Sequence, residues 1–287
     1  MKPPLEPVTP GELESWRAYI GRQEIRREIL DIASLRRFAV AVGSTPEVDR
    51  RAPPLAHWAY FIDAIATDRL GSDGHPQRGG GIFPPIRLPR RMFAAASMSF
   101  REPLTLGEEA ELTVTLTDVT RRMGSTGELI LMGVDRRIRQ EGRERVAERQ
   151  TIVYRAPGPR LAPIDAAARA VKSSETSWTP SPVELFRFSA ATFNAHRIHY
   201  DLPYARDCEG YPGIVVQGPL TALKLLSFAQ ERSPEIIRQF SFRATAPLFA
   251  GQPATFIAGE DGEKVECIRC DGAVAMSARA NSGLDAL

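Results

Sequence analysis

The sequence repeats itself once, with both matching runs in the same order and at nearly the same spacing. LRRFAVAV at 35–42 matches LFRFSAAT at 185–192 in pattern, 150 positions later. SFR at 99–101, with Pro-Leu and a Gly behind it, recurs at 241–243 with the same residues behind it. Two matches in one order favour duplication over chance, so the chain is predicted to fold as two similar halves.

The first half is predicted to hold one helix and several strands. Apolar residues recur at spacings of three and four from Ile25 to Val42, and Gly43 closes the run, which predicts a helix over 11–43. The Pro- and Gly-rich stretch 46–89 is predicted to be irregular. Four alternating runs separated by turn residues predict strands at 94–102, 109–120, 128–139 and 145–155.

The second half follows the same order. A short helix is predicted to begin after residues 179–182, and a second helix to run from Pro219 to Gln230, because proline suits the first helical turn. The remaining alternating runs predict strands at 236–247, 253–260, 263–270 and 272–280. The segment 156–179 has no clear period, and we therefore expect two domains, 1–160 and 161–287.

A helix lying in the curve of an antiparallel sheet is a stable two-layer arrangement. Two such halves predict an α+β protein of the double hot-dog type, with two antiparallel sheets each wrapped around a central helix. The length of 287 residues fits this expectation, because one domain takes roughly 150 residues.

Composition excludes several classes of partner and site. With 37 basic and 35 acidic side chains the net charge is +2, which argues against nucleic-acid binding. No stretch approaches the roughly 20 apolar residues of a membrane helix, and the first residues lack the apolar core of a signal peptide, so a cytoplasmic location is expected. Cys267 and Cys270 fall on a predicted strand, where residues three apart point to opposite faces. We expect no metal site.

The densest reactive cluster is FNAHRIHYD at 193–201, which contains His196 and His199. A glycine-bearing approach at 210–218 leads from it into the helix predicted at Pro219. A helix N-terminus offers unpaired N–H groups to an oxygen that gains negative charge, and a histidine suits proton transfer at neutral pH. We therefore predict His199 as a general base and the Gly218 N–H as an oxyanion donor for a thioester. The alternative for Gly218 is a glycine required only by packing.

This cluster resembles the motif of MaoC-like hydratases and dehydratases, in which Asp-x-Asn-Pro-Ile-His precedes a helix of small residues. Ile198-His199 matches the histidine end of that motif. In this register the family's catalytic Asp falls on Asn194, which cannot accept a proton at pH 7, and its Asn falls on His196. Either Asn194 only orients water beside His199, or His196 or Asp201 supplies the missing proton-transfer function.

Two first-half segments, 56–61 and 79–92, resemble a narrower group, the itaconyl-CoA and 3-methylfumaryl-CoA (mesaconyl-CoA) hydratases. The run 192–201 is also similar to hydroxyacyl-thioester dehydratase type 2. The resemblance implies a cofactor-free hydro-lyase whose partner is an acyl-CoA thioester and whose product is citramalyl-CoA. The repeat places Ser44 opposite Asn194 and Asp49 opposite His199, so the first half is expected to shape the pocket without catalysing the reaction.

A dicarboxylic acyl group keeps a free carboxylate, and Arg binds carboxylates through two parallel hydrogen bonds. Candidate substrate-binding residues are Arg87, Arg90, Arg91, Tyr200, Asp201 and Gln217. The arginines could instead contact CoA phosphates or solvent. Outside the cluster, His57 is expected to be a packed histidine and His75 to lie in an exposed turn.

Three other functions remain open. The same site could dehydrate a 3-hydroxyacyl-ACP or 3-hydroxyacyl-CoA, because hydration and dehydration share a transition state. A thioesterase requires a nucleophile or acidic base on the central helix, where only Gln217 and Thr221 lie near the start. A non-catalytic acyl-CoA-binding protein is consistent with Asn194. A homodimer is also expected, because hot-dog sheets often pair edge to edge.

Overall fold

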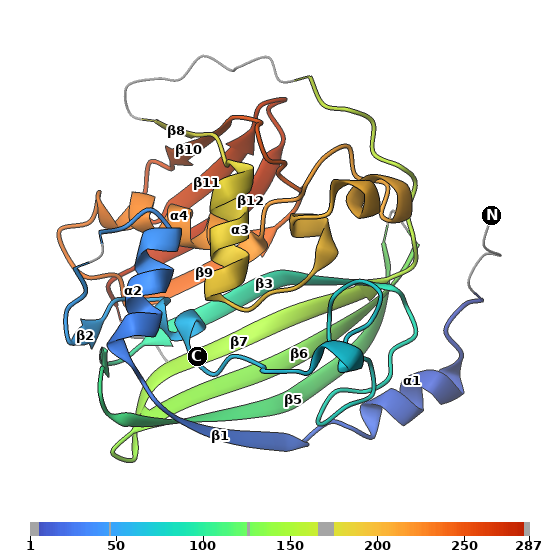
Figure 1. Ribbon diagram of the computed structural model, residues 1–287, viewed down its shortest axis with the longest axis horizontal. Coiled ribbons are helices and arrows are strands. Elements are labelled where there is room, and N and C mark those ends of the chain that lie inside the picture. Colours follow the sequence, from blue (N-terminus) through green and yellow to red (C-terminus); the bar gives the residue numbers. More distant parts are fainter. Residues whose placement is uncertain (1–5, 46, 125–126, 166–174, 284–287) are drawn as a thin grey trace.

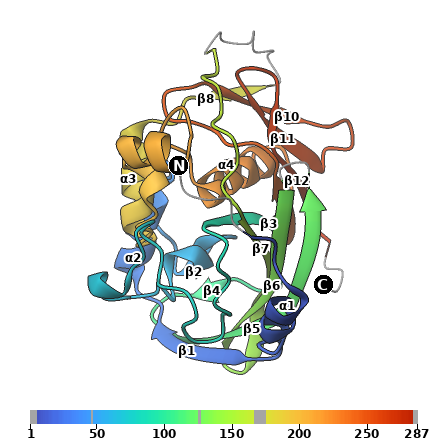
Figure 2. The same cartoon turned by 90° about the vertical axis from the view of Figure 1, so that its right-hand side faces the viewer.

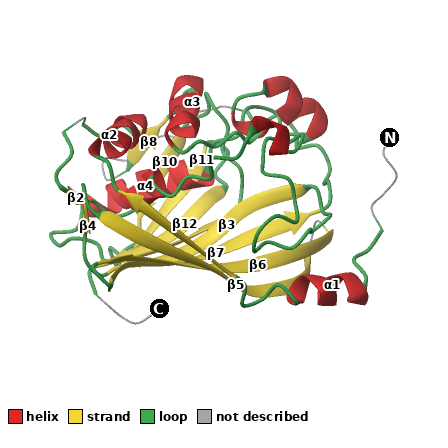
Figure 3. Cartoon of the chain, turned by 60° about the horizontal axis from the view of Figure 1, so that its bottom comes forward, coloured by secondary structure: helices red, strands yellow, loops and turns green. Residues whose placement is uncertain are grey.

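The computed structural model describes residues 6–45, 47–124, 127–165 and 175–283. Ten strands of the described chain form one antiparallel sheet in the order β1-β5-β6-β7-β3-β9-β12-β11-β10-β8. The sheet curves, and helices α2, α3 and α4 lie on one side of it (Figures 1 and 3). Its strands are β1 Gln23–Ile29, β3 Arg90–Phe100, β5 Glu109–Gly124, β6 Gly127–Gln140, β7 Arg143–Arg155, β8 Thr176–Trp178, β9 Gln239–Ala244, β10 Ala254–Ala258, β11 Lys264–Arg269 and β12 Val274–Asn281. A separate pair joins β2 Arg51–Ala52 to β4 Leu104–Thr105.

The two halves of the sheet meet where β3 pairs with β9. Ser99 and Ser241 are equivalent in the repeat and are 142 positions apart. Met98 and Phe240 are also 142 positions apart, and they are paired in the sheet, so Met98 pairs with its own equivalent residue. A local two-fold axis therefore passes between β3 and β9. The helices α2 (Ile32–Ala41) and α3 (Pro182–Ala191) obey the same symmetry, because equivalent rings, Phe38 and Phe188, lie 6.1 Å apart. The sequence repeat is thus a structural repeat, and the predicted double hot-dog fold is confirmed.

Helix α4 (Gly218–Gln230) lies between α3 and the strands of the second half (Figure 2), and it contacts β9, β10, β11 and β12. Eight of its residues are buried, as expected for a helix covered on several sides. The first half differs from the expectation of a second central helix. Its α2 contacts α3 and a 3₁₀ turn, Ala56–Ala59, and the two sheets are fused into one.

The long helix predicted over 11–43 is wrong. The segment divides into α1 (Pro10–Arg17), the edge strand β1 and α2, with Gly21 in the left-handed region at φ +89° before β1. Ile25 and Ile29 are 58% and 63% exposed on β1, so their four-residue spacing does not mark a buried helix face. Asp31 begins α2 instead, because its side chain accepts a hydrogen bond from the Ser34 N–H at 2.8 Å.

The remaining elements lie close to their predicted positions. The four strands of the first half, helices α3 and α4, and strands β9–β12 are all present with shifts of a few residues. Strand β8 was not predicted and lies in the segment 156–179, of which 166–174 lie outside the described residues. Cys267 is buried in β11, and Cys270 lies in the turn after it. No helix in the described ranges is long and apolar enough to span a membrane.

Candidate active site

The histidine-containing loop is attached to the segment that leads into α4. The Val215 N–H donates to the Ile198 carbonyl at 2.9 Å, and the Val216 N–H donates to the Leu248 carbonyl at 2.9 Å. His199 ends the 3₁₀ turn Arg197–His199, and its Nδ1 lies 2.7 Å from the Val215 carbonyl oxygen. These contacts place His199 beside Val215, three residues before Gly218, the predicted oxyanion donor.

The environment of His199 favours the form that can accept a proton. A carbonyl oxygen only accepts hydrogen bonds, so Nδ1 carries the hydrogen and Nε2 keeps a lone pair. The ring is buried, and burial lowers the pKa of His199 to about 4 despite the hydrogen bond to Val215, which raises it. His199 is therefore neutral at pH 7 and can act as a general base.

The first turn of α4 is not capped by its own N-cap side chain. Gln217 occupies the N-cap position and forms no side-chain hydrogen bond to the helix. Its amide Nε2 instead donates to the Leu185 carbonyl at 2.9 Å and to Ser189 Oγ at 2.8 Å, which joins α4 to α3. A Cβ at Gly218 would meet the Phe93 carbonyl at 3.6 Å, an ordinary contact, so packing alone does not require glycine there.

Asn194 orders the backbone of the loop. It follows Phe193, a non-glycine residue at φ +51°, and its N–H donates to the Ser189 carbonyl at 2.8 Å, as in a Schellman motif. Its Oδ1 accepts the backbone N–H of His196 at 3.0 Å. The amide oxygen of Asn194 is therefore occupied in holding the turn that carries His196 and His199.

A third histidine comes from the first half of the chain. The expectation of an exposed turn at His75 is wrong, because its side chain is only 20% exposed and its ring lies 4.0 Å from that of His196. The His196 ring in turn lies 5.2 Å from the His199 ring. Burial lowers the pKa of His75, and burial together with the charges of the neighbouring histidines lowers the pKa of His196 to about 2. The three imidazoles form a row of predominantly neutral rings.

Backbone contacts fix this loop of the first half against the second. The Arg197 N–H donates to the Asp73 carbonyl at 2.9 Å, and its guanidinium donates to the Ser72 carbonyl at 2.9 Å. Gly74, at φ +87°, approaches the Ala195 carbonyl so closely that a Cβ would lie 1.8 Å from its oxygen. The turn sequence Gly-Ser-Asp-Gly-His-Pro at 71–76 was the only local signal for this contact.

The three predicted arginines have different surroundings. Arg87 bonds to Glu12 at 2.6 Å and to backbone carbonyls near the start of the chain. Arg90 is buried in an ion pair with Glu209 at 2.9 Å. The Arg91 side chain forms no hydrogen bond or ion pair with the described residues, and its charge lowers the pKa of both His75 and His196. Arg91 is therefore the arginine left free to bind an anion near the histidines.

The other candidates also have identified partners. The carboxylate of Asp201 accepts from the Arg197 guanidinium at 2.7 Å and from the Tyr204 N–H at 3.0 Å, so it stabilises the loop. Tyr200 is half-exposed and donates to the Ala195 carbonyl at 3.2 Å. His57 is a packed histidine, as expected, buried with its Nε2 3.2 Å from Glu148.

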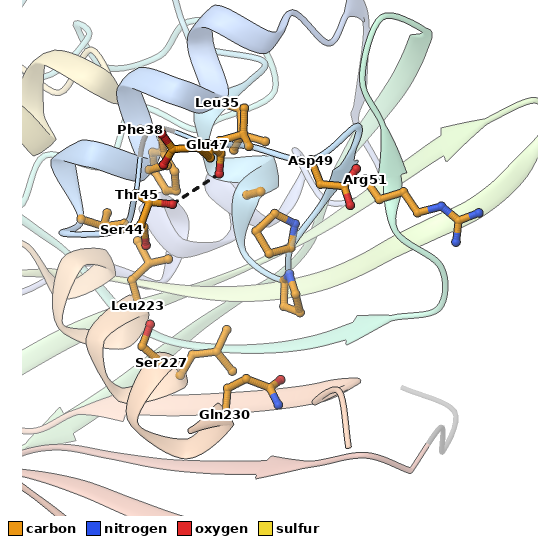
Figure 4. A pocket seen from close by; sticks show the side chains of 17 residues that line it. Leu35, Phe38, Ser44, Thr45, Glu47, Asp49, Arg51, Leu223, Ser227 and Gln230 are labelled. Carbon is orange, nitrogen blue, oxygen red and sulfur yellow. Dashed lines mark hydrogen bonds between the residues drawn. The ribbon is translucent and has the colours of Figure 1, made fainter. Parts of the chain in front are cut away.

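A cavity of about 360 Å³ lies at the position in the first half that corresponds to this site (Figure 4). In the second half, Val215 pairs with Phe249 and Val216 bonds to Leu248. In the first half, Arg51 pairs with Thr105 and Ala52 with Leu104 in the same way. Ala52 therefore corresponds to Val216, and Pro54, two residues after Ala52, corresponds to Gly218. Proline has no N–H, and this copy therefore lacks both the histidine and a counterpart of the Gly218 N–H. The cavity is lined by residues of three segments: Leu35, Phe38, Ser44, Asp49, Pro54 and Leu223 are among them.

Comparison with known proteins identifies the family of this chain. The family model for hydroxyacyl-thioester dehydratase type 2 matches residues 55–250. Mesaconyl-C(4)-CoA hydratase of Chloroflexus aurantiacus is 43% identical over 279 residues, which cover 93% of this chain and 98% of that protein.

Solved structures share the fold. A MaoC-like dehydratase of Phytophthora capsici superimposes with a TM-score of 0.65 at 14% identity, covering 95% of this chain and 99% of that one. A Mycobacterium tuberculosis protein described as having a double hotdog fold gives a TM-score of 0.53 at 14% identity, covering 91% and 95%. The chain therefore belongs to the hydroxyacyl-thioester dehydratase type 2 family and is an enzyme of the hydratase–dehydratase class.

Proposed function

We propose that this enzyme adds water to the double bond of a short, branched dicarboxylic enoyl-CoA, such as mesaconyl-CoA or itaconyl-CoA, to form citramalyl-CoA. The observation that carries the proposal is the neutral His199, with Nε2 unprotonated, held beside the approach to α4 by its bond to Val215. The similarity to mesaconyl-C(4)-CoA hydratase over 93% of the chain supports this substrate class.

In the proposed reaction with mesaconyl-CoA, whose double bond is conjugated with the thioester, His199 Nε2 takes a proton from water, and the resulting hydroxide bonds to the β carbon. The electrons of the double bond move toward the thioester, whose oxygen becomes an enolate stabilised by the Gly218 N–H at the positive end of α4. The α carbon then takes that proton from the His199 imidazolium, which restores the neutral base, so the net change is the addition of one water. The reaction needs no cofactor beyond the CoA of the substrate, and a chelator is expected to leave the rate unchanged.

The free carboxylate of the acyl group needs a cationic partner in this scheme. Arg91 is the best candidate, because Arg87 and Arg90 are already paired with Glu12 and Glu209. A guanidinium without a protein partner can form two parallel hydrogen bonds to a carboxylate. Arg91 thus provides a physical reason to prefer a dicarboxylic substrate over a simple enoyl-CoA.

Loss of the enoyl thioester absorbance tests the proposal with mesaconyl-CoA and crotonyl-CoA as substrates. For itaconyl-CoA, whose double bond is not conjugated with the thioester, formation of citramalyl-CoA is measured by chromatography. We expect turnover of the dicarboxylic thioesters and a loss of about 10²- to 10⁴-fold in kcat for His199→Ala, the range of general base catalysis. If the variant keeps wild-type turnover, His199 is not the base. If no enoyl-CoA is consumed, a non-catalytic acyl-CoA-binding role is favoured.

The family itself favours a second candidate function, dehydration of a 3-hydroxyacyl thioester, for which the same residues would serve in reverse. Formation of the enoyl absorbance from 3-hydroxyacyl-CoA or 3-hydroxyacyl-ACP, faster than consumption of the dicarboxylic substrates, would select it.

A further inference from the structure

We propose that Trp58 is a specificity-determining residue of this enzyme, whose indole forms a fixed wall near Gly218 and limits the acyl group to a short chain. The proposal rests on the hydratase function above and deepens it, because it names the feature that excludes longer enoyl thioesters. It gives the first half of the chain, which has Asp49 at the position of His199, a role in selecting the substrate.

Trp58 belongs to an aromatic cluster that adjoins the start of α4. Its ring packs edge-on against Phe93 and Phe242, with centroids 6.2 and 6.4 Å away, and the two phenylalanine rings lie 5.5 Å apart. The Phe93 carbonyl oxygen lies 3.6 Å from the position that a Cβ would take at Gly218. Because Phe93 lies on β3 and Phe242 on β9, the cluster covers the junction of the two halves beside the predicted oxyanion donor.

Part of this cluster remains open to solvent. Phe242 is buried, whereas Trp58 and Phe93 are only partly buried although both pack against the core. Large apolar side chains with an accessible face are typical of the walls of small-molecule sites. An acyl group whose thioester oxygen binds the Gly218 N–H would therefore extend along the exposed faces of Phe93 and Trp58.

A buried carboxylate fixes the indole. Trp58 Nε1 donates to Glu148 Oε1 at 3.1 Å, and Glu148 is only 2% exposed. The same carboxylate accepts from Gln150 Nε2 at 2.8 Å and lies 3.2 Å from His57 Nε2 and 3.4 Å from Arg136 Nε. Burial raises the pKa of Glu148, but the hydrogen bond from His57 and the charge of Arg136 lower it below its usual range, so the carboxylate is ionised. Since a buried charge is costly unless fixed partners surround it, this network holds the indole in one orientation.

The turn that carries Trp58 is strained at both ends. Leu55, directly before the 3₁₀ turn Ala56–Ala59, has φ +66°, and Phe61, two residues after the turn, has φ +55°. A side chain with a Cβ disfavours this left-handed conformation, which persists only where the surrounding structure fixes it. The Phe61 N–H provides one such contact, because it donates to the Glu28 carboxylate at 2.6 Å. The turn is therefore held in place, and a longer acyl group meets a rigid wall.

The test measures kcat/KM for crotonyl-CoA, trans-2-hexenoyl-CoA and trans-2-octenoyl-CoA. Wild type is expected to prefer crotonyl-CoA. Trp58→Ala should shift the ratio of octenoyl-CoA to crotonyl-CoA by about tenfold or more toward the longer substrate, because one methylene in an apolar pocket is worth about 10- to 200-fold. Trp58→Phe preserves more of the packing and should shift the ratio of hexenoyl-CoA to crotonyl-CoA in the same direction, so it decides the question if Trp58→Ala does not fold.

Trp178 provides a matched control in the second half. Its Nε1 also donates to a glutamate, Glu184, at 3.1 Å, and its partly buried ring stacks on Phe256. Trp178→Ala therefore loses the same side chain and the same kind of hydrogen bond, and it should keep the wild-type ratio. A shift of equal size in this variant would mean that losing any packed indole relaxes the specificity, and the wall at Trp58 would be refuted.

A ratio that does not change in the Trp58 variants would overturn the proposal, as would a wild-type enzyme that hydrates octenoyl-CoA as efficiently as crotonyl-CoA. If wild type hydrates neither these thioesters nor mesaconyl-CoA, it is the hydratase function that fails. Calorimetric binding of the saturated thioesters butyryl-CoA and octanoyl-CoA then still tests the wall. Trp58→Ala should bind octanoyl-CoA more tightly relative to butyryl-CoA than wild type does, and an unchanged preference would refute the wall.

Discussion

Replacing Gly74 by alanine tests whether close docking of the two halves controls the site. The new Cβ would lie 1.8 Å from the Ala195 carbonyl oxygen, 1.2 Å inside the 3.0 Å limit that Cβ contacts keep. One of the two loops must move by about this distance, because both atoms belong to the backbone or are fixed to it. Ala195 precedes His196 directly, so the displacement reaches the histidine row.

The magnitude has two parts. Alanine at a positive φ costs about 1–2 kcal/mol of stability wherever it occurs. The overlap adds about 1–3 kcal/mol, typical of overpacked sites, and a displacement of about 1 Å at a catalytic group can cost roughly 10²-fold in rate. Gly272 is a matched control, because it has a similar φ of +85° with nothing within 4 Å of a Cβ.

Thermal unfolding and kcat for mesaconyl-CoA hydration measure the two parts. We expect Gly272→Ala to lower stability through backbone strain alone and to keep wild-type kcat. Gly74→Ala should be less stable than Gly272→Ala and should lose most of its turnover. If the two variants unfold at the same temperature with the same kcat, the contact with Ala195 has no consequence and the reasoning is refuted.

Three further predictions concern the site itself. Gly218→Ala keeps the backbone N–H and should retain most activity. Gly218→Pro removes that N–H and should lower kcat about 10²- to 10³-fold, as loss of an oxyanion donor does. If the two variants have equal kcat, the Gly218 amide is not the donor. Arg91→Gln should raise KM for mesaconyl-CoA about tenfold or more while leaving crotonyl-CoA unaffected, and Arg87→Gln should not distinguish the two substrates. Because the pKa of His199 is lowered to about 4, the folded state binds fewer protons than the unfolded chain below pH 6.5. The destabilisation that comes from His199 alone should be absent above pH 6.5 and reach about 3 kcal/mol as the pH drops to 4. The acid limb of kcat/KM should lie well below 6.5, and a limb at 6.5 would mean that His199 is solvated.

Patterns within single segments were sufficient to predict most of the fold. Strands of the first half alternate in burial along β5 and β6, which is visible as alternation in the sequence. Helix α4 was predicted from Pro219 and the apolar run behind it, and the repeat implied the two-fold relation now seen between β3 and β9. The position of His199 before a helix start was predicted from the same local order.

The errors arose where a pattern had two interpretations. The isoleucines of β1 are spaced like a helix face, but they lie on an edge strand whose pairing with β5 depends on residues about 90 positions later. Arg87 and Arg90 differ from Arg91 in having ion-pair partners, which are Glu12 for Arg87 and Glu209 for Arg90. Spacing along the chain carries no information about such distant partners.

Periodicity and motif spacing are local properties of the chain. They were therefore enough to predict the duplication, the order of most strands along the chain, and which half carries the pair His196 and His199. Only the tertiary structure placed His75 against His196 and Asp73 against Arg197, more than a hundred positions apart. Those contacts form because Gly74 has no side chain, which allows its loop to approach the backbone at Ala195. The same turn sequence occurs in turns that face solvent, so the sequence alone does not indicate that this turn packs against a histidine.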